Sequence, residues 1–120
     1  MSDKTTTINE LKEQVKRFVS DREWTKYHTA KNLSMSIAIE AAELMELYQW
    51  TGKAMDKETP DKRQLERVKE ELADIIIYCL SLANTMNIDL ASAITDKIEK
   101  NSIKYPVAKV KGKYIKYDQP

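Results

Sequence analysis

The chain of 120 residues is long enough for one domain with a modest buried core, and its formal net charge of +1 gives no strong electrostatic field. Proteins that bind nucleic-acid polymers or membrane surfaces through charge usually carry a larger basic excess, so we expect neither kind of partner. With 2 Gly, 3 Pro and 32% charged residues, the composition favours helices over strands. We therefore expect a small all-α fold.

The first predicted helix begins at a capping box formed by Thr7 and Glu10, in which each side chain accepts a hydrogen bond from the other residue's backbone amide. Apolar residues then recur at helical spacing as far as Val19. We expect this helix to end between residues 20 and 22.

A loop over residues 23–31 is predicted to follow the first helix. Asn32 or Ser34 can then cap a second helix, which runs to about Trp50. The polar, proline-containing residues 51–61 form the next predicted loop.

The third helix is predicted over residues 61–86, with Asn87 as the residue that breaks it. A fourth covers residues 89–103 and stops before Pro106, because the residue preceding a proline avoids the helical region. The basic tail, residues 107–120, could be extended, docked or disordered. Four helices with short connections predict a four-helix bundle, and the apolar residues on more than one face of its two central helices indicate an oligomer.

The single cysteine, Cys79, lies in an apolar segment and cannot form an internal disulfide, which indicates a reducing, cytoplasmic setting. Residues 1–7 are polar and lack the apolar core of a signal peptide. The longest apolar stretch, residues 72–86, is too short and too polar to span a bilayer.

Two acidic pairs occupy the two central helices. Glu40 and Glu43 are three residues apart on the second helix, and Glu71 and Asp74 have the same spacing on the third. This spacing places each pair on one helix face, where like charges repel. Leucines occupy the positions four residues after Glu40 and Glu43, and Asp74 is the only charged residue between positions 72 and 88. If the two helices pack together, four carboxylates converge and need a counter-charge.

A hard divalent cation would supply that counter-charge, although solvated surface acids are the simpler alternative. Ligands that are all oxygen suit Mg²⁺, or else Mn²⁺, rather than Zn²⁺. A ferritin-like di-iron site would need Glu-x-x-His pairs, and the sole histidine, His28, lies in no such motif. Because Mg²⁺ in such sites keeps positions open for water and phosphates, the pattern predicts phosphate-ester or phosphoanhydride chemistry.

Two further groups of residues fit this chemistry. On the fourth helix, Lys97, Asn101 and Lys104 make a basic and polar stripe that would suit a polyphosphate, although it could also be an ordinary solvated face. Trp24 and Trp50 lie near helix ends, where they could be core residues or a stacking platform for a base.

Four segments in this order resemble the MazG-like nucleoside triphosphate pyrophosphohydrolases, and within them the dCTP pyrophosphatases. They are R-E-W-T-K-Y-H-T-A-K-N-L-S-M-S-I, E-A-A-E-L-M-E-L-Y-Q-W, E-E-L-A-D-I-I-I-Y and K-I-E-K-N-S-I-K-Y-P. The resemblance covers about residues 11–106, so we interpret residues 1–106 as a MazG-like domain and residues 107–120 as a tail. It implies an all-α dimer or tetramer. It also implies Mg²⁺-dependent hydrolysis of a (deoxy)nucleoside triphosphate, dCTP or a related nucleotide, to the monophosphate and pyrophosphate, as house-cleaning of the nucleotide pool.

Matching the motifs residue by residue implies roles for each group. The implied metal ligands are Glu40, Glu43, Glu71 and Asp74. The residues that match the base and sugar pocket are Trp24, His28, Trp50 and Tyr78. The residues that match positions near the phosphates are Lys31, Asn32, Lys97, Asn101 and Lys104. The general base could be Glu43 or Glu46. The sequence departs from the family pattern at Ala30, where such proteins often have proline. The absence of proline is expected to loosen the loop that presents His28.

Two alternatives remain at this point. The chain could be a non-catalytic helical interaction or regulatory module that uses its acids for oligomer contacts. It could also be a related all-α enzyme, such as a dimeric dUTPase or a phosphoribosyl-ATP pyrophosphohydrolase. Such an enzyme would share the metal site and differ in its pocket residues.

Overall fold

The computed structural model describes residues 1–49 and 62–114. Its elements in chain order are α1 (Ile8–Asp21), the short 3₁₀ helix η1 (Thr25–Tyr27), α2 (Ala30–Gln49), α3 (Lys62–Thr85), α4 (Leu90–Lys104) and α5 (Val107–Val110). The described residues contain no strand, which confirms the all-α fold class. The chain divides into two compact units, Met1–Ile88 and Asp89–Pro120.

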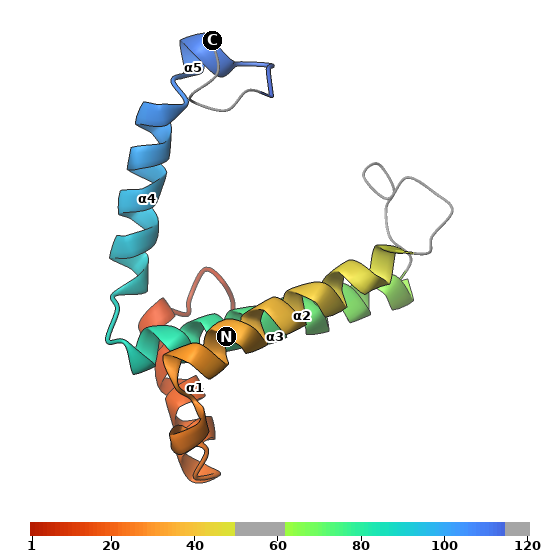
Figure 1. Cartoon of the computed structure of the whole chain (residues 1–120), viewed down its shortest axis with the longest axis vertical. Helices are drawn as coiled ribbons and strands as arrows, with labels where there is room; N and C mark the ends of the chain where they lie inside the picture. Colours follow the sequence, from red (N-terminus) through yellow and green to blue (C-terminus); the bar gives the residue numbers. More distant parts are fainter. Residues whose placement is uncertain (50–61, 115–120) are drawn as a thin grey trace. The chain divides into compact units, whose positions relative to one another are not determined.

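Helix α1 begins as its capping box predicts. Thr7 Oγ1 accepts a hydrogen bond from the Glu10 backbone amide at 3.1 Å, and Glu10 Oε1 accepts one from the Thr7 amide at 3.4 Å. The helix crosses α3 (Figure 1). Its side chains Val15 and Val19 are buried.

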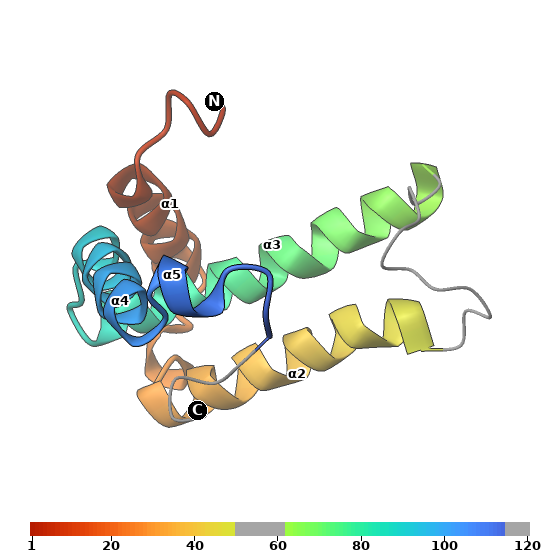
Figure 2. The same cartoon turned by 90° about the horizontal axis from the view of Figure 1, so that it is seen from above.

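Helices α2 and α3 run side by side in opposite directions and make the most extensive helix contact of the first unit (Figure 2). Gln64 Nε2 donates to the Leu47 carbonyl at 3.0 Å, which ties the start of α3 to the end of α2. Leu33, with 1% of its surface exposed, is the most deeply buried large side chain that the structure describes. This antiparallel pairing sets the two acidic motifs against each other.

The start of α2 differs from the prediction that Asn32 or Ser34 would cap it. The helix begins at Ala30, because Thr29 Oγ1 accepts a hydrogen bond from the Asn32 amide at 3.2 Å and the Thr29 carbonyl accepts one from Leu33 at 2.9 Å. Thr29 therefore satisfies the first amides of the helix. The loop predicted before α2 also contains η1.

The end of α3 agrees with the prediction. The helix ends at Thr85, and Asn87 adopts the left-handed conformation with φ of 54°. Two long-range hydrogen bonds fasten this end to α1. Lys12 Nζ donates to the Ile88 carbonyl at 2.7 Å, and Asn84 Nδ2 donates to the Lys12 carbonyl at 3.0 Å.

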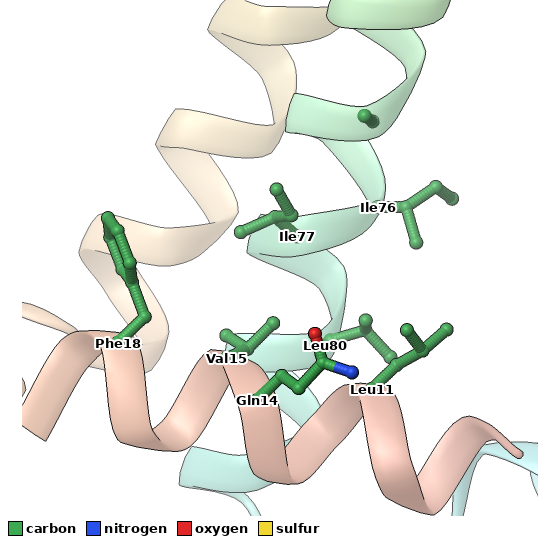
Figure 3. A pocket seen from close by; sticks show the side chains of 8 residues that line it. Leu11, Gln14, Val15, Phe18, Ile76, Ile77 and Leu80 are labelled. Atoms are coloured by element: carbon green, nitrogen blue, oxygen red, sulfur yellow. The ribbon is translucent and has the colours of Figure 1, made fainter. Parts of the chain in front are cut away.

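An apolar groove of about 410 Å³ lies between α1 and α3. Figure 3 shows its side chains, which are Leu11, Gln14, Val15, Phe18, Ala73, Ile76, Ile77 and Leu80. Several of them, such as Phe18 at 46% and Ile76 at 46%, remain well exposed in the single chain. Such a face is compatible with the predicted oligomer, which remains a prediction.

In the second unit, Asp89 caps α4 by accepting a hydrogen bond from the Ser92 amide at 3.0 Å. The helix ends at Lys104, ahead of Pro106, as predicted. Beyond it, α5 is a short helix at the start of the tail, residues 107–120, for which the sequence predicted no single conformation. The four-helix bundle and the boundary between domain and tail remain predictions.

No single helix among the described residues is long and apolar enough to cross a membrane. The pair α3 and α4, counted together across the break between them, would be long and apolar enough by length and composition only.

We expect Asn84→Ala to lower the free energy of unfolding by about 1 kcal/mol, because it removes a part-buried hydrogen bond between α3 and α1. Urea denaturation followed by circular dichroism would measure the change. Asn9→Ala is the matched control, because Asn9 is exposed. This substitution should change the free energy of unfolding by no more than about 0.5 kcal/mol. Equal losses in both variants would contradict a specific role for Asn84.

Candidate metal centre

Three of the four predicted metal ligands come together between α2 and α3. Glu40, Glu43 and Glu71 each offer a carboxylate oxygen, and these three oxygens lie within 4.8 Å of one another. The spacing of Glu40 and Glu43 puts both on the face of α2 that meets α3, and the antiparallel packing brings Glu71 alongside them. We call these three residues the carboxylate cluster.

The cluster contains buried oxygens that lack partners. Glu40 Oε2 and Glu71 Oε2 are both shielded from solvent, and neither makes a hydrogen bond among the described residues. Buried polar atoms are normally satisfied, and a buried carboxylate oxygen without a donor is costly. A bound cation would satisfy both oxygens at once, so the residues present fit a divalent metal ion.

The same crowding changes how the acids ionise. Burial raises the pKa of Glu40 from 4.5 to about 7, and interaction with Glu43 and the negative charges of Asp74 and Glu71 adds to the rise. The pKa of Glu71 is also raised, first by burial and then by Glu43 and Asp74. The cluster thus favours protons when no other cation is present.

Asp74, the fourth predicted ligand, lies outside the carboxylate cluster. It is exposed on α3, three residues after Glu71. Its charge nevertheless raises the pKa values of Glu40 and Glu71, so it lies close enough to act on both. Its role as a ligand remains a prediction.

An open acidic hollow of about 450 Å³ adjoins the cluster. The residues that line it are Glu43, Glu46, Leu47, Gln49, Arg67 and Glu71. Glu46, the other candidate general base, is exposed here and lies outside the three-residue cluster. Arg67 lies one helical turn before Glu71, and the sequence predicts that it shares a face with Glu71 and Asp74. The structure shows that it also lines this hollow, where the sequence predicted no role for it.

His28 and Tyr78 of the predicted base pocket lie near each other, with their ring centroids 6.2 Å apart. His28 Nδ1 is 2.8 Å from Ser81 Oγ on α3, and the His28 carbonyl accepts a hydrogen bond from Thr85 Oγ1 at 3.0 Å. Burial lowers the pKa of His28 from its ordinary value of 6.5. Ser81, which is itself buried, was not identified from the sequence.

Hydrogen bonds connect the loop before α2 to neighbouring residues. Asn32 Nδ2 donates to the Tyr27 carbonyl at 3.0 Å, and this bond adds to the contact of Thr85 with His28. These hydrogen bonds restrain the loop at Tyr27 and His28, and the loosening expected from Ala30 remains a prediction. Asn32 therefore has a structural partner, and Lys31 is exposed in the first turn of α2. The phosphate-binding roles of Asn32 and Lys31 remain predictions.

Trp24 packs edge-on against Phe18, with ring centroids 5.9 Å apart and planes at 74°. It keeps 44% of its surface exposed, and its role in base stacking remains a prediction. Trp50, the other predicted aromatic, lies outside the described residues. In the second unit, Lys97, Asn101 and Lys104 are all exposed on α4, at the spacing that defined the predicted stripe.

Comparison with known proteins decides the family. The model of the MazG-like family matches residues 35–119. The chain belongs to the MazG-like family. It is 32% identical over 114 residues to dCTP pyrophosphatase 1 of Bos taurus and 30% identical over 112 residues to that of Rattus norvegicus. In both cases the match covers 92% of this chain and 66% of the relative, so the chain spans about two thirds of their length.

A solved structure extends this MazG-like likeness to the fold. The crystal structure of a pyrophosphatase from Archaeoglobus fulgidus is similar with a TM-score of 0.72 and 40% sequence identity. The match covers 88% of this chain and 98% of that one. The resemblance inferred from the motifs is thereby confirmed.

The raised carboxylate pKa values predict how stability depends on pH. Between the ordinary pKa of 4.5 and the folded value of about 7 for Glu40, the folded state holds protons that the unfolded chain has lost. The metal-free protein should therefore lose stability as pH rises through this range. Because Mg²⁺ competes with protons for the same oxygens, the increase in Tm that it causes should grow as pH rises.

Thermal melts with and without Mg²⁺ at several values between about pH 5 and pH 8 would measure both trends. A Glu40→Gln variant is the control, because it cannot titrate at this position and should show a weaker trend. An Mg²⁺-induced shift of the same size at both ends of the range would contradict the assignment.

Proposed function

We propose that this MazG-like protein hydrolyses a (deoxy)nucleoside triphosphate, dCTP or a closely related nucleotide, to the monophosphate and pyrophosphate with the help of Mg²⁺. The proposal rests on the carboxylate cluster in a chain of this family, with two buried oxygens that have no hydrogen-bond partner in the described part of the chain. The names of the relatives support a nucleoside triphosphate pyrophosphohydrolase, and those of the curated relatives point to dCTP.

Glu40, Glu43 and Glu71 would hold the metal ion, with Asp74 as the fourth ligand. The oxygen-only donor set favours Mg²⁺, with Mn²⁺ as the alternative. When bound, the ion would supply positive charge to polarise the phosphoryl oxygens. The carboxylates would hold the positive ion beside the acidic hollow, where we propose that the triphosphate enters.

Glu46 is the better candidate for the general base. Glu43 contributes an oxygen to the cluster, whereas Glu46 lines the open hollow and is not needed as a ligand. Its carboxylate would accept a proton from water, whose oxygen forms a new bond to the α-phosphorus. The bond from the α-phosphorus to the bridging oxygen then breaks, and pyrophosphate leaves.

Cationic side chains would stabilise the triphosphate. Arg67 lines the same hollow as Glu43 and Glu46, so it can pair with phosphate oxygens there. We also propose that the phosphates contact Lys97, Asn101 and Lys104, as the family resemblance implies. Trp24, Trp50, His28 and Tyr78 likewise are proposed to hold the nucleobase and sugar.

A panel of deoxynucleoside and ribonucleoside triphosphates would test the activity. We expect Mg²⁺-dependent release of pyrophosphate with matching formation of the monophosphate, fastest for dCTP. Chromatography of the nucleotides and an enzymatic pyrophosphate assay measure the two products. Release of orthophosphate instead would contradict the cleavage position, turnover of dUTP far above dCTP would contradict the substrate, and no turnover at all would contradict the enzyme assignment.

Separate substitutions distinguish ligand from base. Glu43→Gln should reduce activity by about 10²-fold or more and also remove most of the Mg²⁺-induced increase in Tm. Glu46→Gln should reduce kcat by about 10²-fold but leave the increase in Tm intact, because it removes a proton acceptor and no ligand. Glu13→Gln, at an exposed position on α1, is the matched control. Full activity in the Glu46 variant would contradict its role as base.

A further inference from the structure

His28 is attached to α3 by two hydrogen bonds of different kinds. Its ring nitrogen Nδ1 lies 2.8 Å from Ser81 Oγ, while its carbonyl accepts a hydrogen bond from Thr85 Oγ1 at 3.0 Å. Ser81 has only 4% of its surface exposed and lies between the buried residues Leu80 and Ala83. Burying a serine hydroxyl costs free energy unless it is hydrogen-bonded, whereas an alanine would pack at this position without that cost. The hydroxyl of Ser81 therefore indicates a specific role for its hydrogen bond.

The direction of the Ser81–His28 bond follows from hydrogen-bond satisfaction. A buried hydroxyl has one proton to donate, and Ser81 Oγ has no other hydrogen-bond partner among the described residues. If Nδ1 carried the ring proton, the Ser81 proton would have no acceptor, which is costly. Burial lowers the pKa of His28, so the ring is neutral near pH 7 and Nδ1 can accept. The ring proton then resides on Nε2.

We propose that Ser81 is a positioning residue that fixes His28 in its Nε2–H tautomer and so makes it a hydrogen-bond donor to the nucleobase. This inference rests on the proposed function. Within the part of the chain that the structure describes, Nε2 makes no hydrogen bond, so it remains available to a ligand. An Nε2–H group pairs with an acceptor, such as the carbonyl oxygen or ring nitrogen of a pyrimidine, and not with an exocyclic amino group.

The placement on α3 supports this role. Glu71, Asp74, Tyr78 and Ser81 follow one another at three- and four-residue spacing, which keeps them along one side of the helix. Asp74 and Ser81 are separated by about 10 Å along the helix axis. A nucleotide with its phosphates near Glu71 and Asp74 would therefore extend along α3 toward His28.

Nuclear magnetic resonance tests the tautomer without reference to activity. Because His28 is the sole histidine, its two ring nitrogens can be assigned directly in a long-range ¹H–¹⁵N spectrum of the ¹⁵N-labelled protein. At a pH well above the pKa of His28, we expect a single form with the proton on Nε2. In Ser81→Ala we expect averaging between the two tautomers. A proton on Nδ1 in the unaltered protein, or an unchanged spectrum in the variant, overturns the proposal.

Kinetics with dCTP test the role in recognition. Ser81→Ala should raise KM about fivefold while kcat changes less than about twofold, the size expected for one lost hydrogen bond. Ser81→Thr, which keeps the hydroxyl, should restore much of the loss. Ser20→Ala on α1 is the matched control, since Ser20 is exposed.

A double-mutant cycle separates positioning from general stability. In a His28→Ala background, Ser81→Ala should add almost nothing to KM, because Ser81 acts through the ring. Additive effects would show that Ser81 contributes only to folding and would overturn the proposal. If no nucleotide is turned over, the proposed function fails, whereas the tautomer measurement still decides whether Ser81 fixes the ring.

Discussion

The packing of α2 against α3 brings three carboxyl groups into one small volume, and the candidate site depends on this constraint. Glu40 and Glu43 already repel each other within α2, and the contact with α3 adds Glu71. Among the described residues, two of their oxygens are buried without a hydrogen-bond donor, and burial together with the neighbouring acids raises the pKa of Glu40 to about 7. A helix pair that needed only stability would replace these acids with apolar residues, since buried unpaired charge opposes folding. Their presence in a MazG-like chain therefore supports the proposed metal site.

Helix α3 also organises the region around His28. The residue comes from the loop before α2, but its side chain and its carbonyl are both bonded to α3, through Ser81 and Thr85. The loop itself is closed by the bond from Asn32 to the Tyr27 carbonyl. Hydrogen bonds to a long, straight helix hold a loop residue in a defined position, which is the usual requirement for a binding site built on a loop.

Much of the fold could be predicted because it depends on local signals. The capping box at Thr7 and the break at Asn87 act within one helical turn, and the structure has both. Helical spacing fixes the faces of the acidic pairs, so the approach of Glu40, Glu43 and Glu71 could be predicted, whereas Asp74 lies outside their cluster. The start of α2 was misplaced because Thr29, Asn32 and Ser34 are all acceptable caps by type, and only the path of the preceding loop selects among them.

The roles proposed for Ser81 and Arg67 could not be predicted from the sequence, because they depend on tertiary contacts. Ser81 is an ordinary helical serine until His28, which lies 53 positions earlier in the chain, is placed beside it. Arg67 is an ordinary surface cation until the hollow between α2 and α3 is formed. Both residues lie on the same helix as Glu71, so α3 carries a proposed metal ligand, a cation beside it and the residue proposed to orient His28. A single rigid helix can thus set the separation between the ends of an elongated ligand, as the proposed binding of a nucleotide along α3 requires.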